Sequence, residues 1–163
     1  MNRNAITGLT RVPASVLVAD LHALVLAGLQ RLIETEHRVA VSVAVGESLV
    51  SEARRHRPDL IVSEIQLPVL GGLAAARRVL ADRPGTRVVF LTTVEDPMIA
   101  AQAFAQGAAG YLLKSSTAAE FLDGLRAILP GAGCFPPGLP AATPTPFAPA
   151  ATGTRTSAHG RAR

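Results

Sequence analysis

The sequence predicts an α/β fold in which a parallel β-sheet is covered by helices on both faces. Short apolar runs alternate with longer amphipathic ones from residue 15 to residue 129. Because the apolar runs are nearly continuous, the predicted strands are buried on both faces, and each connecting helix lies on a face of the sheet. In such open sheets ligands bind beyond the carboxyl ends of the strands, so functional residues are sought there.

Five strands are predicted, each rich in β-branched or aromatic residues and bounded by Pro, Gly or Asp. In chain order they are SVLVA (15–19), VAVSVAV (39–45), LIVS (60–63), RVVFL (87–91) and GYLL (110–113). Five helices alternate with them, at about residues 22–35, 47–56, 72–82, 96–106 and 117–129. The last helix has the clearest signal, because Thr117 and Glu120 have the spacing of a capping box and apolar residues recur at helical spacing after them.

The 163 residues predict one domain with two flanking segments. Residues 1–13 form an N-terminal extension and residues 14–130 form the folded domain. Seven of the twelve prolines lie between residues 130 and 149, among Ala, Thr and Gly. This composition predicts that residues 131–163 are a disordered, Pro/Ala-rich tail without helix or strand.

The net charge of +4 comes from the flanking segments. Between Val12 and Pro130 there are 11 basic and 12 acidic residues, so the predicted domain has no electrostatic footprint for nucleic acid, and no direct DNA binding is expected. The single Cys134 cannot form an internal disulfide. Neither a signal peptide nor a transmembrane helix is recognisable, which predicts a cytoplasmic protein with no membrane partner.

Polar residues follow four of the five predicted strands. Asp20 comes after the first, Glu64 after the third, Thr92 after the fourth and Lys114 after the fifth. A single Asp at such a position commonly starts a turn or caps a helix. Two acids, a hydroxyl and an amine at one sheet edge, however, are the groups needed to bind a divalent cation and hold a phosphoryl group.

Three stretches resemble the bacterial response-regulator receiver domain, in particular its NarL/FixJ subfamily. They are VLVADLHALVLAGLQRLI, RPDLIVSEIQLPVLGG, and RVVFLTT with GAAGYLLKSS, and the resemblance covers residues 15–137. It implies a flavodoxin-like three-layer sandwich of five βα units with the strand order 2-1-3-4-5. It also implies that Asp20 belongs to a Mg²⁺ site, that Thr92 and Tyr111 take part in switching, and that Lys114 pairs with a phosphoryl group.

Two positions depart from the family pattern. Leu21 stands where the family has the second of two adjacent acids, and Glu64 stands where it has the phosphoryl-accepting Asp. The next loop reads LPVLGG at residues 67–72, where the family commonly has Met-Pro-x-Met-Asp-Gly. Because Mg²⁺ demands octahedral oxygen geometry, we expect a metal site of Asp20 and Glu64 to be weak or lost, and no other cofactor is expected. Glu64 is longer than Asp by one methylene group, and a nucleophile displaced by about 1 Å can lose on the order of 10²-fold in rate.

Three interpretations of Glu64 stay open. In the first, its longer side chain reaches towards Lys114 and Thr92 as a fixed, partial imitation of the phosphorylated state. In the second, Glu64 and Lys114 are an ion pair that outlasted the use of the site, and such a pair need not add stability. In the third, Glu64 itself accepts a phosphoryl group. His22 resembles the third residue of the family's Asp-Asp-His run, and we expect it to cap or pack the first helix.

The sequence therefore predicts a stand-alone, atypical receiver that acts as a phosphorylation-independent interaction module in two-component signalling or transcriptional control, and not as an enzyme. The alternatives are a receiver with residual Mg²⁺-dependent phosphoryl acceptance and a truncated DNA-binding response regulator. By resemblance, the interacting surface is the fourth helix, fifth strand and fifth helix, which would form a homodimer or dock a histidine kinase or another response regulator. The residues expected to be exposed there and to set specificity are Gln102, Gln106, Glu120, Asp123 and Arg126.

Overall fold

The computed structural model describes residues 12–131 and 133–134, and within them strands and helices alternate strictly. The strands are β1 (Ser15–Ala19), β2 (Arg38–Val43), β3 (Leu60–Ser63), β4 (Arg87–Thr92) and β5 (Gly110–Leu113). The helices are α1 (Ala23–Ile33), α2 (Gly46–His56), α3 (Gly72–Asp82), α4 (Pro97–Ala105) and α5 (Ala118–Ile128). None of the described helices is long and apolar enough to cross a membrane.

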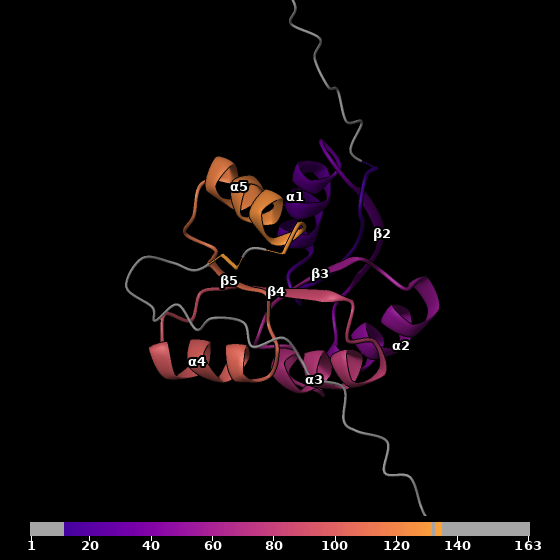
Figure 1. The fold of residues 1–163 in the computed structure, drawn as a ribbon, viewed down its shortest axis with the longest axis vertical. Coiled ribbons are helices and arrows are strands. Elements are labelled where there is room, and N and C mark those ends of the chain that lie inside the picture. The colour runs from indigo at the N-terminus through magenta and orange to yellow at the C-terminus, as the bar shows by residue number, and fades with distance from the viewer. Residues whose placement is uncertain (1–11, 132, 135–163) are drawn as a thin grey trace, which may run out of the picture.

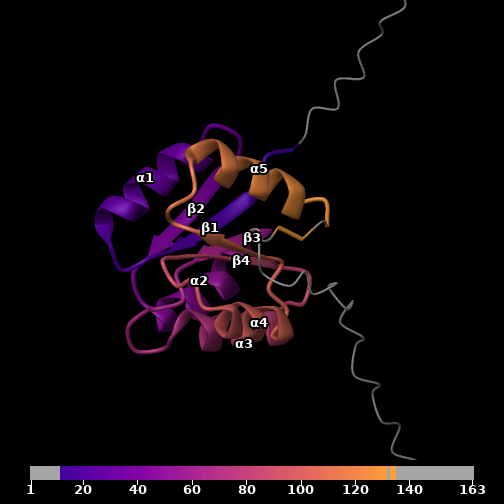
Figure 2. The same ribbon diagram turned by 90° about the vertical axis from the view of Figure 1, so that its left-hand side faces the viewer.

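The strands form one parallel sheet in the order β2-β1-β3-β4-β5, which confirms the predicted fold class. Helices α1 and α5 cover one face of the sheet, and α2, α3 and α4 cover the other (Figures 1 and 2). Successive residues of a strand point to opposite faces, so β1 supplies Val16 and Val18 to the core under α1 and α5, and Leu17 and Ala19 to the other core. Both cores are dominated by aliphatic side chains.

Several element ends differ from the sequence-based expectation. Strand β2 ends at Val43 rather than at Val45, because the carbonyl of Val45 already accepts a hydrogen bond from the backbone N–H of Leu49 in the first turn of α2. Strand β4 extends one residue further and includes Thr92. Helices α1, α4 and α5 are each shorter than expected at both ends. The expected capping box of α5 is present, with Thr117 and Glu120 bonded reciprocally.

The chain after α5 does not leave the fold at residue 130. Cys134 makes a parallel bridge with Gly110, and its carbonyl accepts a hydrogen bond of 3.1 Å from the backbone N–H of Tyr111. This contact covers part of the exposed edge of β5, so the expectation of no strand pairing after residue 130 is wrong at this position. The other residues of the expected extension and tail (1–11, 132 and 135–163) lie outside the described residues.

The loop between β3 and α3 is held by close backbone contacts that require glycine. A Cβ atom on Gly46 would lie 1.6 Å from the carbonyl oxygen of Leu70, and one on Gly72 would lie 2.0 Å from that of Glu64. The backbone N–H of Gly46 donates to the carbonyl of Pro68 at 3.3 Å. Glycine therefore lets this loop pack directly against α2 and α3, which fixes the backbone that carries Glu64.

Replacing Gly72 with Ala is expected to destabilise the fold by about 1–3 kcal/mol, because the added methyl group overlaps the Glu64 carbonyl. Gly28→Ala is the matched control, since Gly28 lies inside α1 with open space around the position of a Cβ atom. That control should gain about 0.5–1 kcal/mol from better helix propensity. Urea denaturation of both variants gives the two free energies of unfolding. If the two substitutions changed the free energy of unfolding by the same amount, the steric explanation would be wrong.

Candidate functional site

The four polar residues predicted at the strand ends come together at the carboxyl edge of the sheet. Asp20 and Glu64 directly follow β1 and β3, Thr92 is the last residue of β4, and Lys114 directly follows β5. These strands are consecutive in the sheet order, so the residues that end them lie next to one another. The side chains of Asp20 and Glu64 are 1% and 5% exposed, and that of Lys114 is 15% exposed.

Lys114 bridges the two carboxylates. Its Nζ lies 2.5 Å from Oδ2 of Asp20 and 2.7 Å from Oε2 of Glu64. Two buried carboxylates without a counter-charge would be strongly destabilising, so the ammonium group compensates for placing both in the same buried site.

The second oxygen of the Glu64 carboxylate is turned back into the site. Oε1 accepts a hydrogen bond of 2.6 Å from the hydroxyl of Thr92, and bonds of 2.6 and 3.1 Å from the backbone N–H groups of Ile65 and Gln66. The side chain of Glu64 thus reaches both Lys114 and Thr92, the two contacts expected from its extra methylene group. Hydrogen bonds to a charged acceptor are short and strong, and these fix the orientation of the carboxylate.

Asp20 is held by the start of the first helix. Its Oδ1 accepts a hydrogen bond of 2.8 Å from the backbone N–H of His22, and the His22 ring nitrogen Nδ1 lies 3.1 Å from the same oxygen. His22 occupies the N-cap position of α1 without a side-chain capping bond, and its side chain is 61% exposed. His22 therefore lies at the capping position of α1, as expected, but its ring contacts Asp20 and bonds no backbone N–H of the helix. Leu21, which lies between Asp20 and His22 in the chain, is 43% exposed, and its side chain has no atom that could bind a metal ion.

Hydrogen bonds connect Glu64 to a buried aromatic ring on β5. The Thr92 hydroxyl that donates to Glu64 also accepts from the backbone N–H of Val94 at 3.2 Å. The carbonyl of Val94 in turn accepts a bond of 2.7 Å from the phenol of Tyr111. The ring of Tyr111 is fully buried, and its centroid lies 6.5 Å from that of Phe104 on α4. Burial, followed by the charge of Glu64, raises the pKa of Tyr111 to about 12, so the phenol is a donor at neutral pH.

The ionisation of the site follows from these contacts. Burial alone would raise the pKa of Glu64, but hydrogen bonds from Lys114, Thr92 and the backbone of Gln66 outweigh it, and this pKa lies below its ordinary value. Burial would likewise lower the pKa of Lys114, but its bonds to Asp20 and Glu64 raise it overall. Both groups are therefore charged across the neutral range.

The residues expected to form a partner surface are not equally available. Gln102, Glu120, Asp123 and Arg126 are exposed, whereas Gln106 is only half-exposed and its Oε1 is buried, which corrects the expectation for that residue. Glu120 is engaged in the capping box of α5. Arg126 pairs with Asp123 at 2.5 Å and with Glu36 after α1. Among these residues, Gln102 on α4 is therefore the most available for contact.

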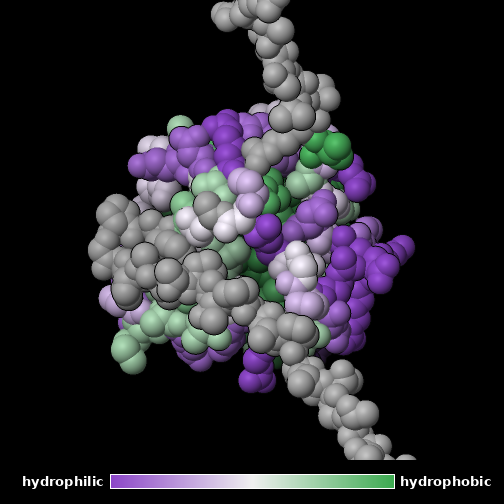
Figure 3. All heavy atoms as spheres, in the orientation of Figure 1, coloured by the Kyte–Doolittle hydropathy of each residue, from purple (hydrophilic) through white to green (hydrophobic). Residues whose placement is uncertain are grey.

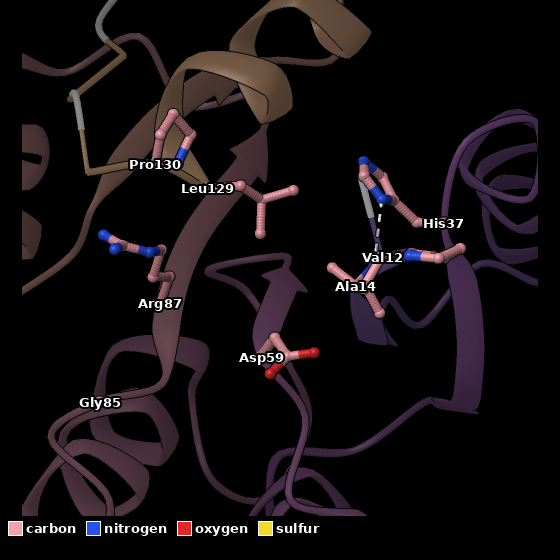
Figure 4. Close-up of a pocket in the computed structure, with 9 residues that line it drawn as sticks. Val12, Ala14, His37, Asp59, Gly85, Arg87, Leu129 and Pro130 are labelled. Carbon is pink, nitrogen blue, oxygen red and sulfur yellow. Dashed lines mark hydrogen bonds between the residues drawn. The ribbon is translucent and has the colours of Figure 1, made fainter. Parts of the chain in front are cut away.

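A separate pocket lies at the opposite, amino-terminal edge of the sheet (Figure 4). It has a volume of about 540 Å³, and its polar lining comes from His37, Asp59 and Arg87. Nδ1 of His37 accepts a hydrogen bond of 3.4 Å from the backbone N–H of Ala14, and Asp59 accepts one of 2.8 Å from that of Ser15. No sequence pattern predicts this pocket, because its residues are far apart in the chain and match no motif.

The shifted pKa values predict how the free energy of unfolding depends on pH. Because the pKa of Glu64 is lower in the folded than in the unfolded chain, its contribution is fully present above about pH 4.5 and is lost as the pH falls through the folded value. Because the pKa of Lys114 is raised, its contribution is complete below about pH 10.5 and is lost as the pH rises through the folded value.

Urea denaturation of the wild type and of Glu64→Gln across this range measures the contribution of Glu64. At neutral pH the variant should be less stable by about 1.5–3 kcal/mol, the usual worth of hydrogen bonds to a charged group. The difference should start to shrink below about pH 4.5 and go on shrinking as the pH falls through the lowered pKa of Glu64 in the folded wild type. A difference that stays constant down to acid pH would show that the charge of Glu64 does not stabilise the fold.

Comparisons with known proteins agree with this architecture. The family model of the response regulator receiver domain matches residues 16–126. Response regulator GacA of Pseudomonas viridiflava is 32% identical over 118 residues, which are 71% of this chain and 55% of the relative. The transcriptional regulatory protein YxjL of Bacillus subtilis is 31% identical over 122 residues, 74% of this chain and 56% of the relative. The chain thus spans about half the length of these curated relatives.

Solved structures give the same result. A two-component response regulator of the LuxR family from Aurantimonas superposes with a TM-score of 0.74 at 31% identity, covering 77% of this chain and 91% of that one. The signal receiver domain of the response regulator NarL from Mycobacterium tuberculosis gives a TM-score of 0.70 at 28% identity, covering 74% and 99%. With its fold, its strand-end residues and the family match over residues 16–126, the chain belongs to the response regulator receiver domain family of two-component signalling.

Proposed function

We propose that this receiver is a phosphorylation-independent signalling module in which Glu64 does permanently what a phosphoryl group does transiently in its relatives. The observation that carries the proposal is the contact of one carboxylate with both Thr92 and Lys114, at 2.6 and 2.7 Å. By resemblance, these are the residues that sense and pair with the phosphoryl group. Glu64 thus places negative charge, without phosphate, on the two groups that respond to it.

The contacts around Thr92 support a path from Glu64 to the surface. Thr92 is bonded to Glu64, Val94 is bonded to Thr92 and to Tyr111, and Tyr111 packs near Phe104 on α4. Each step is a buried or half-buried contact between neighbours, so a change in the position of the Thr92 hydroxyl alters the loop that precedes α4. Such a path favours the interpretation that Glu64 imitates the phosphorylated state over the interpretation that Glu64 and Lys114 are an ion pair with no signalling role.

The surface that would carry the output lies on α4, β5 and α5. Helix α4 contains no charged residue, and Met98 at its start is 78% exposed. Figure 3 shows hydrophobic residues over α4, at the lower left, whereas the surface over α2, at the right, is hydrophilic. An apolar, uncharged helix on the surface is suited to contact another protein, and we propose a second copy, a histidine kinase or another response regulator as the partner.

The function is binding rather than catalysis. In this proposal the chain neither accepts nor hydrolyses a phosphoryl group, because Glu64 occupies the acceptor position and Leu21 replaces an acid. DNA binding is not assigned to the described domain, which has nearly balanced charges between Val12 and Pro130.

The first test exposes the wild type and the double variant Leu21→Asp/Glu64→Asp to acetyl phosphate or beryllofluoride at millimolar Mg²⁺. Intact mass and amide NMR spectra should show no change for the wild type. The double variant should gain a phosphoryl group from acetyl phosphate, and with either reagent its amide signals should shift at Thr92, Tyr111 and Lys114. A phosphoryl mass on the wild type would overturn the proposal and make Glu64 a working acceptor. The double variant is also the control for a competent scaffold.

A second test separates imitation from a residual ion pair. Glu64→Gln removes the charge and keeps the size of the side chain, so imitation predicts amide shifts along Val94, Tyr111 and α4, together with at least a severalfold loss of partner or self-association. Ser115→Ala is the matched control, because Ser115 is an exposed residue beside Lys114. If the shifts of Glu64→Gln stay within the immediate neighbours of Glu64 and Lys114, the ion pair has no signalling role.

A further inference from the structure

We infer that the ammonium group of Lys114 takes the place of a divalent cation, so that this receiver has an internal cation and no Mg²⁺ site. The receiver fold implies a Mg²⁺ ion bound by acids after β1 and β3, and the side chains present here decide whether such an ion fits. This inference concerns the cation and does not depend on whether Glu64 imitates phosphorylation.

The site has fewer oxygen ligands than the family pattern, which weakens Mg²⁺ binding but does not exclude the ion without the contribution of Lys114. The position after Asp20 is Leu21, so two carboxylates remain where the family has three acids. Among the described residues, no three His, Cys, Asp or Glu side chains are gathered so as to hold a metal ion. Mg²⁺ prefers six oxygens in a nearly ideal octahedron, and two carboxylates fill a small part of that shell.

The oxygens that remain are already engaged by the protein. Oδ2 of Asp20 and Oε2 of Glu64 both contact Nζ of Lys114, at 2.5 and 2.7 Å. Oδ1 of Asp20 accepts from His22, and Oε1 of Glu64 accepts three hydrogen bonds. Each of the four carboxylate oxygens therefore has a donor, and a metal ion would have to displace one of them.

The charges lead to the same conclusion. Two carboxylates and one ammonium group give a net charge of −1 with no ion bound, whereas a divalent ion would change it to +1. An ion bound to Oδ2 of Asp20 or Oε2 of Glu64 would also lie beside the Lys114 ammonium, which contacts those same oxygens. Like charges repel strongly at such short range in a poorly solvated site. The ammonium group of Lys114 therefore supplies the positive charge that a bound ion would otherwise bring to these two carboxylates.

The test uses Mn²⁺ as a paramagnetic probe and Mg²⁺ as its competitor, followed by amide NMR. For the wild type, Mn²⁺ at millimolar concentration should give no saturable broadening at Asp20, Leu21, Glu64 and Ile65. Lys114→Met keeps both carboxylates and removes the internal cation, so it should gain saturable broadening that Mg²⁺ reverses, with at least a tenfold increase in affinity. Leu21→Asp/Glu64→Asp should also bind and is the positive control.

The outcomes are distinct from those of the phosphorylation test. Saturable, Mg²⁺-reversible broadening of the wild type would overturn the inference, even if the wild type gains no phosphoryl mass. A folded Lys114→Met variant that binds no Mn²⁺ would also overturn it, because the missing acid alone would then explain the loss of metal. If Lys114→Met does not fold, the ¹⁵Nζ signal of Lys114 in the wild type decides: it should not change with Mg²⁺, and a saturable shift would contradict the inference.

Discussion

The ion pairs of Lys114 with Asp20 and Glu64 are the constraint on which the rest of the site depends. The three residues follow three different strands, so one ammonium group ties the carboxyl ends of β5, β1 and β3 together. Both carboxylates are almost completely buried, and a buried negative charge needs a cation nearby to compensate it. The position of the Glu64 carboxylate therefore determines how the Thr92 hydroxyl is oriented. Through Thr92 it also affects Tyr111.

The backbone around Glu64 is built to keep that carboxylate in place. At Gly46 and Gly72 the loop after β3 packs directly against the backbone at the starts of α2 and α3. Within the loop, the backbone N–H of Leu70 donates to Pro68 at 2.8 Å around Val69, whose φ of +67° is unfavourable for a β-branched residue. Strain of this kind persists only where the surroundings impose it. The loop that follows Glu64 is thus held in a single conformation.

Local signals predicted the elements, and only the folded chain shows how they meet. Apolar runs bounded by Pro, Gly or Asp predicted the strands, and the Thr117–Glu120 spacing predicted the start of α5. The pairing of Cys134 with β5 depends on a hydrogen bond to a distant segment, which no local pattern reveals. The end of β2 depends on where the first turn of α2 begins, which the apolar run through Val45 conceals. The strand ends identified the four site residues. The contact of the His22 ring with Asp20 and the bonds of Val94 could not be predicted, because they depend on side-chain and loop conformation.

The two departures from the family pattern are physically linked. A third acid at position 21 would leave one ammonium group facing three carboxylates, a charge excess that a metal ion would have to compensate. With Leu21 there, Lys114 alone spans the two remaining acids, and the longer side chain of Glu64 still accepts from Thr92. A site that had merely decayed would have no reason to supply four donors to one carboxylate, from Ile65, Gln66, Thr92 and Lys114. Their convergence on Glu64 supports the proposal that this carboxylate serves as a permanent charge in the site.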